Sequence, residues 1–303
     1  MNINLIGVPI KYGCDRDGVQ FGPDRLRELG IMDIIRNNGF NVYDMGNIYV
    51  PDILDECKYD WHKTAKYFDP INEVNTNLAH SVYSSLLSKS FPFVIGGDHS
   101  IGTGSISGAS KHFKEMAVIW IDAHGDINDI ETSPTGNVHG MPLAATMNVG
   151  HPNMTNLYYE GIKVKPENVY IIGARDLDPG EIDLVEKLNI NLYTMDDINT
   201  IGLEKILDDT ITKLKSSNVD GVHLSFDIDV LDSEIVPGTG TPVGDGINVL
   251  ESKIILDKIL SSKLVTSIDF VEFNPLLDIE DKTAKVCMEI LEFIFEKFCD
   301  YRY

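Results

Sequence analysis

The chain has 303 residues, of which 43% are hydrophobic and 24% charged, a composition that excludes disordered and fibrous proteins. Its 47 acidic and 25 basic side chains give a formal net charge of -22, which disfavours binding to nucleic acids or anionic membranes and favours a small cationic substrate. The four scattered cysteines form no C-x-x-C pair, and the N-terminus shows no signal-peptide pattern. We therefore expect a cytoplasmic protein without a membrane span.

Short apolar runs typical of strands alternate along the chain with segments of helical period. Strands are predicted at residues 3–8, 41–45, 91–95, 117–121, 169–172, 190–193, 222–226 and 264–271. Helices are predicted at residues 23–30 continuing towards 37, and at 71–87, 101–113, 179–188, 203–214, 249–260 and 284–298. This alternation indicates one domain over residues 1–303, a three-layer α/β/α fold with a central parallel sheet of about eight strands. The irregular stretches 47–69 and 128–152 are long enough to be functional loops.

Four predicted strands run directly into polar residues. In chain order these residues are Gly96-Gly97-Asp98-His99-Ser100, Asp122-Ala123-His124-Gly125-Asp126, Asp227-Ile228-Asp229 and Glu272. In an open parallel sheet, ligands bind beyond the carboxyl ends of the strands. We therefore expect these four clusters to meet at one edge of the sheet.

The spacing within two of these clusters is that of metal ligands. Alternate residues of an extended segment project to the same side, so Asp122, His124 and Asp126 should point together, as should Asp227 and Asp229. With His99, these groups would repel one another unless cations lay among them. The four negative charges of the aspartates balance the four positive charges of two divalent ions. Six side chains are too few for two separate ligand shells, so one carboxylate from each cluster would have to bridge the two ions. Such an ion pair activates water for hydrolysis.

Other polar residues near these clusters have simpler interpretations. His223 and Ser225 lie deeper in the strand before Asp227, so we expect hydrogen-bonded core or supporting groups rather than ligands. Asp98 and Asp232 are expected in the same supporting role. Gly96-Gly97 matches no phosphate-binding glycine motif, which excludes a nucleotide site of that kind.

Three segments resemble the signatures of the ureohydrolase family, the dimanganese enzymes that include arginases and agmatinases. They are Gly96-Gly97-Asp98-His99-Ser100, Asp122-Ala123-His124-Gly125-Asp126 and Ser225-Phe226-Asp227-Ile228-Asp229. The similarity runs from Gly18-Val19-Gln20-Phe21-Gly22-Pro23 to Val271-Glu272-Phe273-Asn274-Pro275. It implies the arginase-like fold, two Mn²⁺ ions per subunit and, as in many members of the family, a homo-oligomer, either a trimer or a hexamer.

The resemblance also implies roles for single residues. His99, Asp122, Asp126 and Asp227 would bind one manganese ion and Asp122, His124, Asp227 and Asp229 the other, so that Asp122 and Asp227 bridge. His139 matches the proton-shuttle histidine and Glu272 the acid that holds the substrate guanidinium, while Thr241 would line that pocket. Asp126 would stabilise the tetrahedral intermediate formed when a metal-bridging hydroxide attacks the guanidinium carbon.

Two loops indicate which guanidine is cleaved. The segment Arg175-Asp176-Leu177-Asp178-Pro179-Gly180-Glu181 is similar to the arginase segment that meets the substrate α-amino group, with Asp178 as the contact and Glu181 beside it. Asn128, Thr135 and Asn137 resemble the contacts of the α-carboxylate. Agmatine lacks that carboxylate and would leave polar groups unpaired, which favours L-arginine, hydrolysed to L-ornithine and urea.

Two features depart from the family pattern. They are Gly125, where the family usually has threonine, and the segment 129–134.

Three alternatives remain open. The first is an agmatinase, or a ureohydrolase acting on guanidinobutyrate, formiminoglutamate or another guanidino acid. The second is a catalytically silent metal-binding or regulatory protein on the same scaffold, which the presence of His139 and Glu272 disfavours. The third is a single-zinc hydrolase similar to deacetylases, which the two acidic clusters disfavour.

Overall fold

The computed structural model describes residues 1–303, and its centre is one sheet of eight strands. The strands are β1 (Asn2–Val8), β2 (Asn41–Asn47), β3 (Ser90–Gly96), β4 (Met116–Ile121), β5 (Val169–Ala174), β6 (Asn191–Thr194), β7 (Gly221–Asp227) and β8 (Val265–Val271). All neighbours pair in parallel, in the order β2-β1-β3-β8-β7-β4-β5-β6. The predicted fold class and all eight predicted strands are therefore confirmed.

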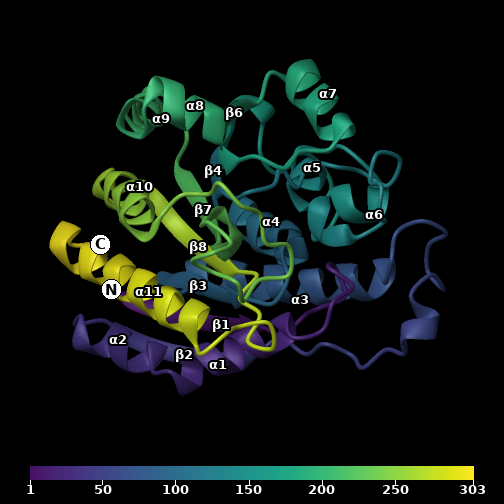
Figure 1. The fold of residues 1–303 in the computed structure, drawn as a ribbon, viewed down its shortest axis with the longest axis horizontal. Coiled ribbons are helices and arrows are strands. Elements are labelled where there is room, and N and C mark those ends of the chain that lie inside the picture. Colours follow the sequence, from purple (N-terminus) through teal and green to yellow (C-terminus); the bar gives the residue numbers. More distant parts are fainter.

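Helices cover both faces of this sheet. They are α1 (Gly22–Glu28), α2 (Ile31–Asn37), α3 (Phe68–Leu87), α4 (Gly102–His112), α5 (Pro142–Thr146), α6 (Pro152–Thr155), α7 (Pro179–Leu188), α8 (Met195–Ile201), α9 (Leu203–Ser216), α10 (Val249–Ser261) and α11 (Lys282–Tyr301). In Figure 1, α2, α9, α10 and α11 lie to the left of the sheet and α3 to α6 to its right. No helix is both long and apolar enough to cross a membrane.

The apolar strands explain why the sheet lies between two layers. Every residue of β3, β4, β5 and β7 is buried, which requires cover on both faces. The largest core cluster, of 43 residues, joins strand residues such as Phe93 and Phe226 to Phe295 of α11 and Leu256 of α10. At the edge of the sheet β2 is mostly exposed, so only the central strands bury residues at both faces.

Several predicted elements differ from the structure. The helix predicted to run from residue 23 towards 37 is two helices, because Gly30 between α1 and α2 adopts a left-handed conformation with φ 98°. The stretch 128–152, predicted to be irregular, contains α5, and the short helix α8 was not predicted. Both are only five to seven residues long, too short for a helical period to show in the sequence.

The two helices α3 and α4 approach each other closely beneath the strand end that carries His99. Buried Asn75 of α3 accepts a hydrogen bond from the backbone of Gly104 in α4 at 2.8 Å. One turn later, a Cβ on Gly108 would lie 2.4 Å from the carbonyl oxygen of Ala79. Only glycine permits this spacing, so Gly104 and Gly108 fix the position of the helix that follows His99.

We expect Gly108→Ala to destabilise the protein. Overpacking costs about 1 to 3 kcal/mol, while the better helix propensity of alanine returns at most about 1 kcal/mol. The net loss should be on the order of 1 kcal/mol in urea unfolding. Ser84→Ala on the exposed face of α3 is the control and should change the free energy of unfolding by less than about 0.5 kcal/mol. If Gly108→Ala and Ser84→Ala have the same free energy of unfolding, α3 and α4 accommodate the added methyl group without cost, and the prediction is wrong.

Candidate metal centre and substrate cavity

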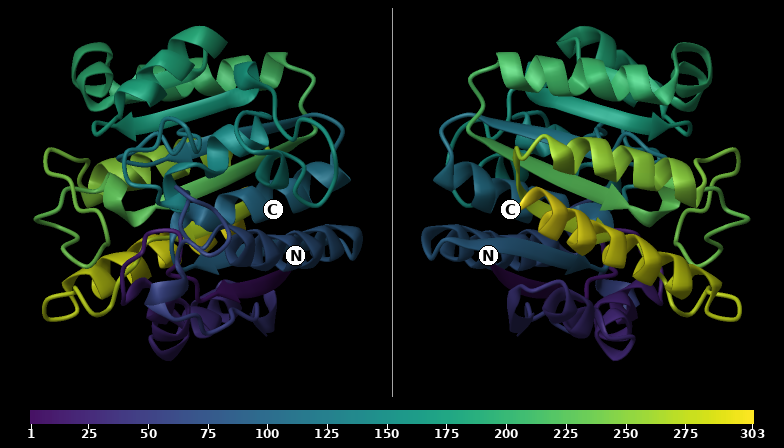
Figure 2. Two further views of the ribbon diagram at one scale, coloured as in Figure 1. Left: turned by 90° about the vertical axis from the view of Figure 1, so that its right-hand side faces the viewer. Right: turned by 90° about the vertical axis from the view of Figure 1, so that its left-hand side faces the viewer.

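The polar clusters lie at the carboxyl ends of β3, β8, β7 and β4, four strands that are consecutive in the sheet. Figure 2 shows the strands from the side, with their arrowheads pointing the same way. Residues at these ends are level in the pairing register, as Ile121 pairs with Phe226 and Asp227 with Val271. The prediction that the four clusters meet at one edge is confirmed.

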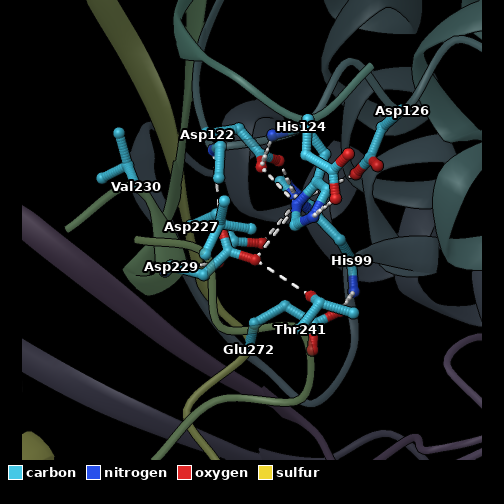
Figure 3. Close-up of polar contacts among 12 residues, drawn as sticks. His99, Asp122, His124, Asp126, Asp227, Asp229, Val230, Thr241 and Glu272 are labelled. Atoms are coloured by element: carbon cyan, nitrogen blue, oxygen red, sulfur yellow. Dashed lines mark hydrogen bonds and ion pairs between the residues drawn. The ribbon is translucent and has the colours of Figure 1, made fainter. Parts of the chain in front are cut away.

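His99 is the centre of a first group of ligand atoms (Figure 3). Its Nδ1 lies 2.9 Å from Asp122 Oδ2, 3.0 Å from Asp227 Oδ2 and 3.1 Å from Asp126 Oδ2. The ring is buried, yet its Nδ1 has no hydrogen bond of acceptable geometry to any of these oxygens. One imidazole nitrogen and three carboxylate oxygens thus face the same small space, as the ligands of a cation do.

His124 forms a second group beside the first. Its Nδ1 lies 3.1 Å from Asp229 Oδ2 and 3.3 Å from Asp122 Oδ1. Asp122 therefore takes part in both groups, one oxygen in each, which is the geometry of a bridging carboxylate. Asp227 takes part in the first group alone, through Oδ2, and its Oδ1 accepts a hydrogen bond from the amide of Asp229 at 2.8 Å.

The local backbone differs from the extended combs predicted from the sequence. Asp229 lies in a 3₁₀ turn, η6 (Ile228–Val230), and Asp126 has a left-handed backbone with φ 53°. The side chains converge because an aspartate at each strand end accepts the amide two residues later, an Asx turn. Asp122 binds the amide of His124 at 2.7 Å, and Asp227 binds that of Asp229. The predicted residues do converge, but through Asx turns and not through an extended backbone.

Supporting residues hold the first group in place. The Trp120 ring stacks on His99 with centroids 3.9 Å apart, and its Nε1 donates to Asp122 at 2.9 Å. Ser225 contacts His99 Nε2 at 2.7 Å, as expected for a supporting group. His223 lies deeper, between Ser267 and Asp269. The role of Trp120 was missed, because a tryptophan within an apolar strand reads as core.

The electrostatics of the cluster indicate a cation site. Burial, together with the charges of Asp229 and Asp122, raises the pKa of Asp227 well above its ordinary value. Burial and Asp122 raise the pKa of Asp126 to about 6. Burial favours a neutral ring, but the surrounding carboxylates raise the pKa of His99 well above its usual range. The repulsion among these carboxylates would be relieved by positive charge, and carboxylate and imidazole donors suit Mn²⁺ and related divalent ions.

A cavity of about 240 Å³ opens next to this cluster. His124 and Asp126 line one part of it, and the predicted substrate contacts Asn128, Thr135 and Asn137 line another. His139, Asp178, Glu181 and Thr241 also line it, and Thr241 donates to Asp229 Oδ2 at 3.0 Å. The structure thus brings six of the predicted substrate residues to one cavity beside the predicted metal ligands, whereas the seventh, Glu272, does not line it.

Glu272 and His139 form a pair at the same edge. Glu272 has φ 64°, and its Oε1 accepts from the amide of His99 at 2.8 Å and lies 3.0 Å from His139 Nδ1. Burial favours the neutral imidazole, but the carboxylate of Glu272 outweighs it and raises the pKa of His139 to about 9. The other oxygen, Oε2, is buried without a hydrogen-bond partner and can accept from a cationic ligand.

Asp178 and Asn128 adjoin each other across the cavity. Asn128 Nδ2 donates to Asp178 Oδ2 at 2.8 Å, and Asn128 Oδ1 is buried without a partner. Glu181 stands behind them, accepting the amides of Ile127 at 3.1 Å and Asp178 at 2.9 Å. Burial raises the pKa of Glu181 to about 7. A Cβ at Gly125 would lie 2.9 Å from Glu181 Oε1, so the small residue at this position accommodates Glu181.

Arg175 is a second residue whose role the sequence did not reveal. Its guanidinium donates to the carbonyls of Asp229 at 2.9 Å, Val230 at 3.1 Å and Val243 at 2.9 Å. It therefore ties the turn that carries Asp229 to the segment near Thr241. Arg175 begins the segment that resembles the arginase loop, but only the fold shows that its partners are backbone carbonyls.

The sequence and the fold are similar to those of known proteins. The family model described as "Arginase family" matches residues 1–295. An arginase of Brevibacillus brevis is 43% identical over 97% of both chains. The solved structure of arginase from Bacillus caldovelox has a TM-score of 0.92 and 38% identity, covering 97% of this chain and 98% of that chain. A formimidoylglutamase of Bacillus subtilis, at 22% identity and a TM-score of 0.79, shares the fold.

We expect Mn²⁺ to stabilise the metal-free protein, because it removes the repulsion among the buried carboxylates. At about 100 times its Kd, the ion should raise the Tm by roughly 5 to 10 °C. Asp227→Asn should lose most of this shift in differential scanning fluorimetry. Asp232→Asn is the control, since Asp232 accepts backbone amides outside the cluster, and it should keep the full shift. An undiminished shift in Asp227→Asn would contradict the assignment of the ligands.

Proposed function

The chain belongs to the arginase family, and on this basis we propose that it is a metal-dependent hydrolase that converts L-arginine to L-ornithine and urea. The observation that carries the proposal is the single cavity that His124 and Asp126 share with Asn128, Thr135, Asn137 and Asp178. A ligand in this cavity can therefore reach the metal cluster with one end and the loop residues with the other.

The six clustered residues fit the family's metals. We propose that His99, Asp122, Asp126 and Asp227 hold one Mn²⁺ and that Asp122, His124, Asp227 and Asp229 hold the other. When bound, these ions would activate water for attack on the guanidinium carbon. The support is the pair of ligand groups that share Asp122, together with the unpartnered Nδ1 of His99.

The other residues of the site would bind the guanidinium and move the proton. Glu272 Oε2 is a buried acceptor without a partner, suited to a guanidinium N–H. The carboxylate of Glu272 raises the pKa of His139 and so favours its protonated ring, and its Nε2 makes no hydrogen bond within the protein. We propose that this nitrogen donates the proton to the leaving amine of ornithine. Asp126, which lines the cavity, would hydrogen-bond the tetrahedral intermediate.

The far end of the cavity would recognise the amino acid. Asp178, with the unpartnered Oδ1 of Asn128, offers acceptors for an α-ammonium group. Hydroxyl and amide groups of Thr135, Asn137 and Asn128 offer donors for the α-carboxylate. Agmatine would leave those donors unpaired, and the cost would be greatest at Asn128, the buried member of the three, because a buried polar group without a partner discriminates strongly between substrates.

We also propose, from the family resemblance, that manganese is the native ion, that the protein is cytoplasmic and that it assembles as a trimer or hexamer. Among the alternatives, agmatine or another guanidino compound would use the same metal cluster and differ from L-arginine in its contacts at the far end of the cavity. The paired ligand groups disfavour a single-zinc hydrolase.

Urea release from three substrates tests the proposed specificity. L-Arginine carries both the α-ammonium and the carboxylate, agmatine lacks the carboxylate, and 4-guanidinobutyrate lacks the ammonium. With Mn²⁺ present, we expect kcat/KM for L-arginine to exceed that for either analogue by about 100-fold or more. A preference for agmatine or guanidinobutyrate would overturn the assignment of L-arginine, and no urea from any of the three would overturn guanidine hydrolysis itself.

A further inference from the structure

The part of the cavity that would receive the α-carboxylate has no basic side chain of its own. None of the thirteen residues that line the cavity is lysine or arginine, whereas Asp126, Asp176, Asp178 and Glu181 are acidic. The protein as a whole has a net charge of -22. The two histidines of the cavity, His124 and His139, adjoin the metal cluster, so a carboxylate at the loop end would face mainly these acids, and positive charge behind the cavity wall would offset their repulsion.

Lys66 supplies such a charge from outside the cavity. Its Nζ donates to Asn137 Oδ1 at 2.7 Å, and its side chain is only 14% exposed. Asn137 Nδ2 donates one hydrogen to the carbonyl of Cys14 at 3.1 Å, which leaves its second N–H for the cavity. An ammonium group on the amide oxygen polarises the amide and strengthens this remaining donor.

The segment around Lys66 also fixes the backbone of the cavity loop. The amide of Lys66 donates to the carbonyl of Gly136 at 2.9 Å. Gly136 has φ 71°, and a Cβ there would lie 2.0 Å from the carbonyl oxygen of Thr64. The backbone of residues 64–66 thus packs directly against the loop between Thr135 and Asn137, where only glycine fits.

Asp15 holds Lys66 in this position. Its Oδ2 lies 2.9 Å from Lys66 Nζ and 3.0 Å from Lys58 Nζ, and Asp15 itself has φ 51°. Although burial opposes its charge, the two lysines lower the pKa of Asp15 below its ordinary value. Lys58 shares the aspartate but has no hydrogen bond to the cavity loop.

We propose that Lys66 is a specificity-determining positioning residue, which orients and polarises Asn137 so that the loop accepts the substrate α-carboxylate. This inference rests on the proposed function. It assigns the segment of residues 58–66 a part in choosing amino acids over decarboxylated amines, although none of its side chains lines the cavity. Lys66 acts through Asn137 and has no part in the chemical step.

The test compares Lys66→Met with the matched control Lys58→Met, which removes the other lysine of Asp15. For Lys66→Met we expect the KM for L-arginine to rise about tenfold with kcat within twofold of wild type. The inhibition constant of L-ornithine should rise by a similar factor, and that of putrescine, which lacks the carboxylate, much less. Lys66→Arg should restore most of the affinity, and Lys58→Met should stay within twofold of wild type throughout.

Other outcomes overturn the proposal. A parallel loss of ornithine and putrescine binding, or a fall in kcat with KM unchanged, would show that Lys66 merely supports the structure. An unchanged KM in Lys66→Met would show that Asn137 needs no lysine. If Lys66→Met does not fold, failure of Lys66→Arg to bind ornithine more tightly than putrescine decides against the proposal. Wild-type protein that releases no urea from L-arginine would overturn the proposed function as well.

Discussion

The mutual repulsion of four buried aspartates is the constraint around which this structure is organised. Asp122, Asp126, Asp227 and Asp229 are each at most 6% exposed, and the imidazoles of His99 and His124 lie 2.9 to 3.3 Å from their oxygens. Burying such charges without compensation costs several kcal/mol for each group. The sheet concentrates them at one edge, where the proposed cations would relieve the repulsion within the cluster. The stability lost at this edge is the cost of the proposed metal site.

Three short turns convert the parallel sheet into this site. At the ends of β3, β4 and β7, the aspartates Asp98, Asp122 and Asp227 each accept the backbone amide two residues later. The same geometry recurs because each segment must leave its strand abruptly while keeping its side chains at the edge of the sheet. Left-handed backbones at Asp126 and Glu272 complete the bend. Such strain in non-glycine residues persists where the surroundings determine the conformation, often at functional sites.

The sequence predicted the layers, all eight strands and the residues of the cluster, because continuous apolar runs such as Ala117–Ile121 and the polar residues after them are local signals. The backbone after the strands was predicted incorrectly. An extended segment was expected at Asp227 and Asp229, but an Asx turn brings the two side chains to the same side. Trp120 escaped notice because a tryptophan within an apolar strand is typical of core, whereas Arg175 and Lys66 escaped notice because their partners lie far away in the chain. Arg175 binds carbonyls more than 50 residues distant, and Lys66 meets Asn137 across 71 residues. Contacts of this kind depend on the fold, which no local pattern encodes.

The central claim is that one cluster holds two divalent ions that share Asp122. Titration of the metal-free protein with Mn²⁺, followed by electron paramagnetic resonance and metal analysis, tests it most directly. The account predicts two ions per chain and a spin-coupled spectrum, because ions that share a bridging ligand lie about 3.5 to 4 Å apart. Saturation at one ion per chain, or two ions with the spectrum of isolated Mn²⁺, would contradict it.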